Sequence, residues 1–101
     1  MTRRPREFEW LDEIVEKNRA KHGIEPEEAE SALLNTDPAP YIRRVADGKY
    51  QALCRVEDDG AYLVVIFALP EPHVTRVISA RAMDSSERAE YRRRREGKQS
   101  R

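Results

Sequence analysis

The apolar stretch over residues 74–81 ends in an arginine close to a hydroxyl, and this combination suits phosphate binding. A guanidinium contacts two phosphate oxygens at once and keeps its charge at any relevant pH. If the stretch is a regular strand, Ser79 and Arg81 share one face and Arg76 lies on the other. Arg81 could therefore clamp a phosphate, or it could form an ion pair with Glu87 in the following helix. For Arg76, the opposite face favours a surface salt bridge.

Three further basic residues could move a proton or hold a phosphate. His22 titrates near neutral pH, as a general acid or base should. It also stands where a last helical turn is expected, and the helix dipole favours histidine there, so capping or a core hydrogen bond is the favoured alternative. Lys21 and Lys49 could each hold a phosphate or be ordinary solvated lysines.

The C-terminal part contains a second group of candidates. Glu87 and Tyr91 are one helical turn apart and could act as an acid or contact a substrate, although packing of Tyr91 on a sheet is favoured. Arg92 begins a run of four arginines that could grip nucleic-acid phosphates. Four adjacent residues point in all directions around a helix and do not form one face. Ordinary exposure of these side chains to solvent is therefore the favoured interpretation of the run. Cys54 is expected to be a small buried residue and not a nucleophile.

Helix signals occur in three places. One helix should begin near Leu11 or Asp12 and end at Gly23 in a left-handed cap. Pro26 should open a second helix, which residues 35–38 stop, and Asp84 or Ser85 should cap a third. The inner stripe of the first helix is expected to contain Leu11, Ile14, Val15, Asn18, Ala20 and His22. The inner face of the second is expected to contain Ala29, Ala32 and Leu33.

The sequence also predicts strands, one before the first helix and four between the second and the third. A short strand is expected over 6–10, and a period of two predicts four more over 41–46, 49–56, 61–69 and 74–81. Gly48 and Gly60 supply the positive φ of tight hairpins, and residues 70–72 should form a rigid turn. The run 62–67 is apolar on both faces and should be central. The order β-α-α-β-β-β-β-α predicts an α+β fold with an antiparallel sheet packed by helices.

Composition limits the possible classes. The 101 residues predict a single domain, with an ordered core over about 6–95, and 39% hydrophobic residues suffice for a modest core. One cysteine and separate histidines indicate no disulfide, no metal and no cofactor. No apolar run is long enough for a membrane, which favours a cytoplasmic location. Residues 1–60 hold 10 Lys/Arg against 14 Asp/Glu, and residues 61–101 hold 9 against 5, so a polyanion would bind on one side only.

Five short motifs, in order and spacing, resemble the BrnT (DUF497) family of bacterial toxins over about residues 7–92. They are Phe8-Glu9-Trp10, Asn18-x-x-Lys21-His22-Gly23-Ile24, Glu27-Glu28-Ala29, Ile78-Ser79-Ala80-Arg81 and Glu87-Arg88-x-x-Tyr91. The resemblance implies a RelE-like fold, metal-independent cleavage of RNA and neutralisation by a cognate antitoxin encoded beside the toxin. It also implies that the toxin–antitoxin complex binds operator DNA.

Under this resemblance, the candidate residues fall into two sets. The catalytic candidates are Arg81, His22, Lys21, Glu87 and Tyr91, and the RNA-binding candidates are Lys49, Arg76, Ser79 and Arg92. The antitoxin is expected to cover the basic side of the sheet and to bury apolar edge surface. An exposed sheet edge would also allow a homodimer.

The chain departs from the family pattern at three places. Leu11 stands where the family usually has Asp, Ile14 where it has Lys, and Gly48-Lys49 where it has Glu-Arg. The two apolar replacements either tighten core packing or remove part of the site. The alternative function is therefore a non-catalytic binding module that acts through a protein partner or through DNA-bound regulation.

Overall fold

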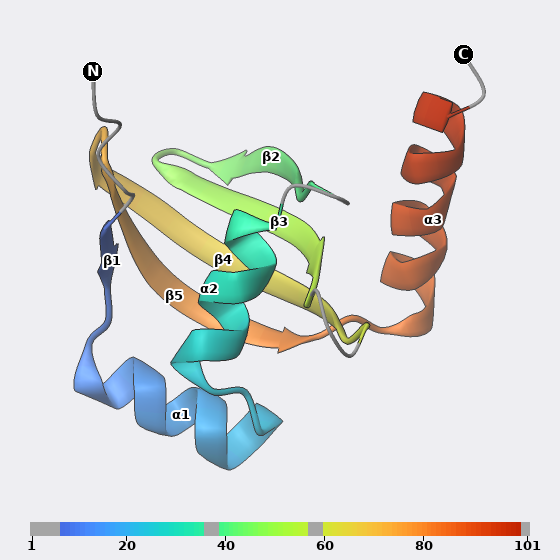
Figure 1. The fold of residues 1–101 in the computed structure, drawn as a ribbon. Coiled ribbons are helices and arrows are strands. Elements are labelled where there is room, and N and C mark those ends of the chain that lie inside the picture. Colours follow the sequence, from blue (N-terminus) through green and yellow to red (C-terminus); the bar gives the residue numbers. More distant parts are fainter. Residues whose placement is uncertain (1–6, 36–38, 57–59, 100–101) are drawn as a thin grey trace.

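The computed structural model describes residues 7–35, 39–56 and 60–99, and the side chains up to Arg94. The chain forms three helices and five strands in these regions, in the predicted order (Figure 1). They are β1 (Glu7–Glu9), α1 (Asp12–His22), α2 (Pro26–Leu34), β2 (Tyr41–Ala46), β3 (Lys49–Arg55), β4 (Tyr62–Glu71), β5 (Val74–Ala82) and α3 (Ser85–Gln99).

The strands form one sheet in the order β1-β5-β4-β3-β2. The pairs β2–β3, β3–β4 and β4–β5 are antiparallel, whereas β1 lies parallel to β5. The α+β class is confirmed, but the sheet is mixed and not purely antiparallel. The long connection from β1 through two helices and three strands allows this parallel pairing, which a tight hairpin would forbid.

The hairpins depend on the predicted glycines. Gly48 and Gly60 have φ values of 72° and 76°. The predicted rigid turn over 70–72 is wrong, because β4 continues through Pro70 to Glu71 and the turn contains Pro72 and His73. The ladder between β4 and β5 shifts register between Ala68 and Glu71, and such an irregularity accommodates a proline that cannot donate a hydrogen bond.

Helix α1 attaches to the sheet through one buried amide. Asn18 is 1% exposed, and its Oδ1 accepts a hydrogen bond of 3.3 Å from the backbone N–H of Ala80 in β5. The short strand β1 pairs with β5 only from Val74 to Arg76. The bond to Asn18 therefore gives the N–H of Ala80 an acceptor where no described strand supplies one. The predicted inner stripe of α1 is wrong at Leu11, Ala20 and His22, which are exposed, because the helix contacts the sheet along a narrow line around Asn18.

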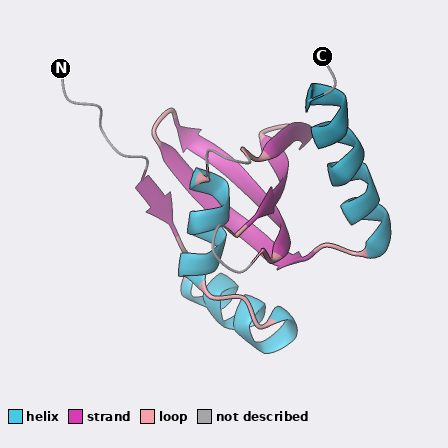
Figure 2. Cartoon of the chain, turned by 45° about the vertical axis from the view of Figure 1, so that its right-hand side comes forward, coloured by secondary structure: helices cyan, strands magenta, loops and turns pink. Residues whose placement is uncertain are grey.

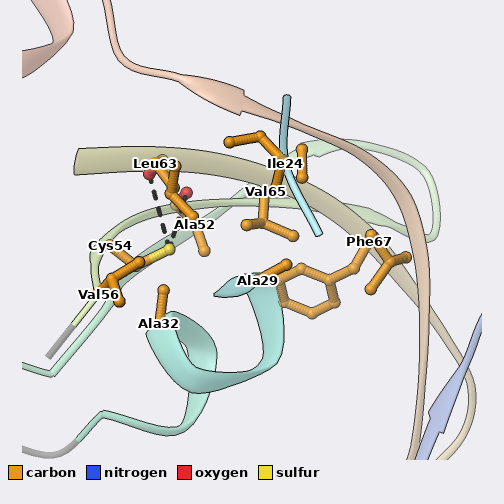
Figure 3. Close-up of a cluster of buried hydrophobic side chains, with 11 residues drawn as sticks. Ile24, Ala29, Ala32, Ala52, Cys54, Val56, Leu63, Val65 and Phe67 are labelled. Carbon is orange, nitrogen blue, oxygen red and sulfur yellow. Dashed lines mark hydrogen bonds between the residues drawn. The ribbon is translucent and has the colours of Figure 1, made fainter. Parts of the chain in front are cut away.

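One face of the sheet is closed by α2 together with the segment that follows α1. The buried side chains of this core are Ile24, Ala29, Ala32, Ala52, Cys54, Val56, Leu63, Val65, Phe67, Val77 and Ala80 (Figure 3). Cys54 is buried, as predicted, and burial raises the pKa of its thiol to about 12. The thiol donates weakly to the carbonyls of Ala52 and Leu63 (Figure 3).

Helix α3 covers one end of the other face and stands apart from α1 and α2 (Figure 2). Beneath α3, a smaller cluster contains Leu53, Val64, Met83 and Tyr91. Strand β4 is therefore central and buried on both faces, as its double apolar pattern predicted. No helix within the described regions has the length and apolar character that a membrane crossing requires.

Candidate functional site

Strand β5 is irregular at the point where its chemistry-bearing residues lie. Ser79 pairs with Ile66 of β4, whereas Val77 pairs with the next residue, Phe67. Ile78 is therefore an extra residue on β5, which defines a β-bulge. Because side chains alternate between the two faces of a strand, one extra residue inverts the alternation beyond it.

The bulge places the two arginines of β5 on the same face. Val77 and Ala80 both belong to the closed core, although a regular strand would separate them. Arg76 and Arg81 consequently both face the α3 side, since their partners Ala68 and Val64 occupy that face of β4. The prediction that Arg76 and Arg81 lie on opposite faces is wrong for this reason, while the shared face of Ser79 and Arg81 is as predicted.

Strand pairing places two rows of side chains on this face, beside the cluster beneath α3. One row runs from β2 to β5, and the other runs from β3 to β1. Their members are Arg43, Gln51, Ile66 and Ser79 in the first row, and Lys49, Ala68, Arg76 and Glu9 in the second. We call these two rows, together with the adjoining Arg81, the platform. It brings four cationic side chains around a floor of small, polar and apolar groups.

Arg43 and Gln51 were not predicted as site residues. A regular hairpin from the Asp47–Gly48 turn would pair Arg43 with Ala52 and place it on the closed face. The register shift between Arg44 and Ala46 pairs Arg43 with Gln51 instead, and its Nε donates to Oε1 of Gln51 at 2.9 Å. No sequence signal that we recognise marks this shift.

Arg81 forms the ion pair that the sequence left open as an alternative. Its Nη1 and Nη2 donate to the two carboxylate oxygens of Glu87 at 2.8 and 2.7 Å, and Nη1 also donates to the carbonyl of Ala82. Its side chain nevertheless stays 38% exposed. A guanidinium has further N–H groups, including Nε–H, so the paired Arg81 can still donate to a phosphate.

Glu87 ties this ion pair to the start of α3. Its Oε1 accepts the backbone N–H of Asp84 at 2.9 Å, and Oδ1 of Asp84 accepts the backbone N–H of Glu87 at 2.8 Å. This reciprocal pattern is a capping box. The hydrogen bonds from Arg81 lower the pKa of Glu87, and the same bonds raise the pKa of Arg81. Both groups are therefore charged at neutral pH.

The other platform cations differ in their partners. Arg76 pairs with Glu9 of β1, and Arg43 donates to Glu90 of α3 at 3.0 Å. Lys49 is exposed and forms no salt bridge within the described regions. Exposed ion pairs contribute little to stability, so a phosphate can compete with these carboxylates.

The two candidates on α3 have different environments. Tyr91 is 2% exposed and packs edge-on against Tyr62 with ring centroids 5.9 Å apart, which is the packing role favoured from the sequence. Arg92 is exposed on α3.

Lys21 and His22 end α1, and both are exposed. A strand N–H lies in the plane of its sheet, so the bond from Ala80 to Asn18 places α1 beside the edge of β5. No hydrogen bond or ion pair of the described residues connects Lys21 or His22 to Arg81 or Glu87. Across the part of the chain that the structure describes, no three His, Cys, Asp or Glu residues gather closely enough to hold a metal ion.

Comparison with known proteins assigns the family. Residues 10–87 match the model of the ribonuclease toxin BrnT of type II toxin–antitoxin systems. The chain belongs to the BrnT family. No curated protein matches it as a relative. The crystal structure of the Brucella abortus ribonuclease toxin BrnT has the same fold, with a TM-score of 0.65 and 18% identity over 79% of this chain and 99% of the other. The family of type II toxins implies an antitoxin as protein partner.

The structure shows what one departure from the BrnT family pattern, Leu11 in place of Asp, does to helix α1. Leu11 occupies the N-cap of α1, provides no side-chain cap and is 46% exposed. It therefore does not tighten the core. An Asp at this position, as in the family pattern, would accept a hydrogen bond from the first turn of the helix.

Proposed function

We propose that this chain is a toxin that cleaves single-stranded RNA on the platform without a metal ion, and that its antitoxin neutralises it. The observation that carries the proposal is the bulge at Ile78, which gathers Arg76, Ser79 and Arg81 on one face. Four cations on one half of a sheet face suit a polyanionic strand, and Gln51 and Ser79 add neutral donors between them.

The proposed reaction is an intramolecular phosphoryl transfer. The 2′-oxygen of a ribose attacks the adjacent phosphorus and loses its proton to a base, while the bond to the 5′-oxygen breaks and that oxygen gains a proton. The products are a 2′,3′-cyclic phosphate and a 5′-hydroxyl. Arg81 stabilises the negative charge that builds up on the phosphate oxygens during this step, and Arg76, further along the same strand, binds a neighbouring phosphate.

Glu87 acts in this proposal as a positioning residue for Arg81. Its lowered pKa makes it a poor base at neutral pH, but its two oxygens fix the plane of the guanidinium. Because the capping box holds Glu87 at the start of α3, the helix and the arginine are positioned together. Lys21 and His22 are left out of this proposal, because no hydrogen bond or ion pair of the described residues joins them to Arg81 or Glu87.

The test is an RNA cleavage assay with the isolated chain. A labelled single-stranded RNA should be cut in the presence of a chelator, and Arg81→Ala should lower the rate by about 100-fold, as the loss of one transition-state donor does elsewhere. Arg19→Ala is a matched control, since it also removes an arginine from an exposed ion pair, with Glu25 at 2.8 Å. Equal rates for both variants, or no cutting by the wild type, would refute the proposal.

The second candidate is a binding module without catalysis. It is favoured by the carboxylates that already pair with Arg43, Arg76 and Arg81. This candidate predicts a tight complex with the antitoxin and no RNA cleavage by the free chain. Binding of operator DNA by such a complex, and a homodimer of the free chain, remain predictions from the family resemblance.

A further inference from the structure

The outer strand β2 has an edge that no other described strand pairs with. It follows a regular ladder with β3 from Tyr41 to Arg44, and its residues beyond Tyr41 are all exposed. Such an edge presents unpaired backbone N–H and C=O groups to any extended segment of suitable side chains.

An apolar groove of about 270 Å³ lies beside this edge on the closed face of the sheet. It is lined by Leu33, Ile42, Tyr50, Phe67, Leu69 and Thr75. Ile42 projects from β2 itself and is 49% exposed, and Leu69 on β4 is also exposed. The rings of Tyr50 and Phe67 stack at 5.6 Å and form the floor of the groove. Clustered exposed apolar side chains of this kind mark interaction sites.

The opposite face of the same edge is cationic. Arg43 shares that face with Tyr41, and Arg94 of α3 lies over the Tyr41 ring at 4.6 Å. Glu90 is the single carboxylate that pairs with both arginines, at 3.0 and 3.6 Å. The described side chains along the edge therefore leave a surplus of positive charge.

The free edge, the apolar groove and the surplus of positive charge together limit which partner segment can bind beside β2. We infer that an extended segment of the antitoxin adds to the sheet alongside β2, with apolar side chains in the groove and acidic side chains towards Arg43 and Arg94. Because strand side chains alternate between faces, the segment must alternate apolar and acidic residues. This inference rests on the proposed function for its partner, but not on the chemistry of the platform.

A second copy of the chain fits this edge less well. Antiparallel pairing of β2 with itself would bring Arg43 and Arg44 of one copy next to those of the other, and like charges across a strand pair destabilise it. The register shift after Arg44 also shortens the regular edge, which limits sheet-to-sheet association.

The test uses the complex with the full-length antitoxin encoded beside the toxin gene. Amide hydrogen exchange over residues 41–44 should slow at least ~10-fold on complex formation, since new ladder bonds protect edge amides. Ile42→Asp should raise the dissociation constant at least ~10-fold while RNA cleavage by the free variant stays at the wild-type rate. Leu69→Asp, which changes another residue that lines the groove, should act in the same direction.

Leu11→Asp is the matched control, because Leu11 is similarly exposed, at 46%, but lies on α1. It should bind the antitoxin as the wild type does. Unchanged affinity of Ile42→Asp, protection confined to other surfaces, or an isolated chain already dimeric with residues 41–44 protected would each overturn the inference. A free chain that cuts no RNA but binds the antitoxin through β2 would instead refute only the proposed function.

Discussion

The two faces of the sheet differ in what covers them: one is buried under a continuous apolar core, and the other is partly open and charged. The closed face packs α2 and the segment after α1 onto a continuous apolar core, and its polar contribution from α1 is the buried amide of Asn18. The α3 face buries one end under a small cluster and presents arginines and a lysine at the other. The closed face therefore supplies stability. Charged side chains on the α3 face can be replaced with little change in the free energy of unfolding.

Two truncations on β4 test this comparison, and one of them should have the largest effect. Leu63→Ala, on the closed face, should lower the free energy of unfolding by about 2–5 kcal/mol, because it leaves a cavity in a packed core. Ile66→Ala, on the platform, should lower it by about 1 kcal/mol, since that side chain is only partly buried. Urea denaturation measures both, and equal losses would contradict the division of roles.

The attachment of α1 gives the next largest effect. Asn18→Ala should lower the free energy of unfolding by about 1–3 kcal/mol, because the backbone N–H of Ala80 then loses its acceptor in a buried place. Arg19→Ala, one residue further along and exposed, should change it little. If Asn18→Ala proves as stable as the control, the amide is not what attaches the helix.

A gain of stability is expected at the N-cap of α1. Leu11→Asp should raise the free energy of unfolding by about 1 kcal/mol, because a carboxylate there caps free backbone N–H groups that Leu11 leaves without a side-chain partner. For a chain of this size the melting temperature should rise by about 4–8 °C. An unchanged or lower melting temperature would show that Leu11 contributes packing outside the helix.

The smallest effect is the pH dependence of the Arg81–Glu87 pair. The folded state lowers the pKa of Glu87, chiefly through hydrogen bonds from Arg81, so the pair stabilises the fold above the unfolded pKa of about 4.3. That contribution is lost as the pH falls through the folded pKa. Glu87→Gln keeps a capping-box side chain without the charge, so it should be less stable than the wild type at pH 7.

Thermal melts across the acid range measure this dependence. The gap between the melting temperatures of the wild type and Glu87→Gln should shrink once the pH drops below about 4. A gap that stays constant from neutral to acid pH would mean that the ion pair contributes nothing to the folded state.

The sequence predicted the elements well and the faces of β5 poorly. Gly23, Gly48, Pro26 and the double apolar run of β4 each have a local physical meaning, and each predicted its helix end, turn or burial. The bulges at Ile78 and near Val45 have no such local cause. A bulge is a property of the pairing between two strands, and each of these inverts which side chains share a face.

The candidate site was predicted in part for the same reason. Ser79 and Arg81 were placed together because they lie beyond the bulge, where alternation is regular again. Arg76 was assigned to the wrong face because it precedes the bulge. Lys21 and His22 were grouped with Arg81 from the family motifs, and motifs do not show whether two segments meet in space. No described hydrogen bond or ion pair joins them to Arg81, so their catalytic role stays a prediction.

The central claim is that RNA binds the platform, and binding of an uncleavable RNA tests it most directly. A single-stranded oligonucleotide with 2′-O-methyl groups lacks the attacking hydroxyl and should bind without being cut. Titrated into ¹⁵N-labelled protein, it should shift the amide resonances of Arg76, Ser79 and Arg81 and leave those of α1 in place. Shifts confined to Lys21, His22 and their neighbours, with the β5 resonances unmoved, would contradict the account.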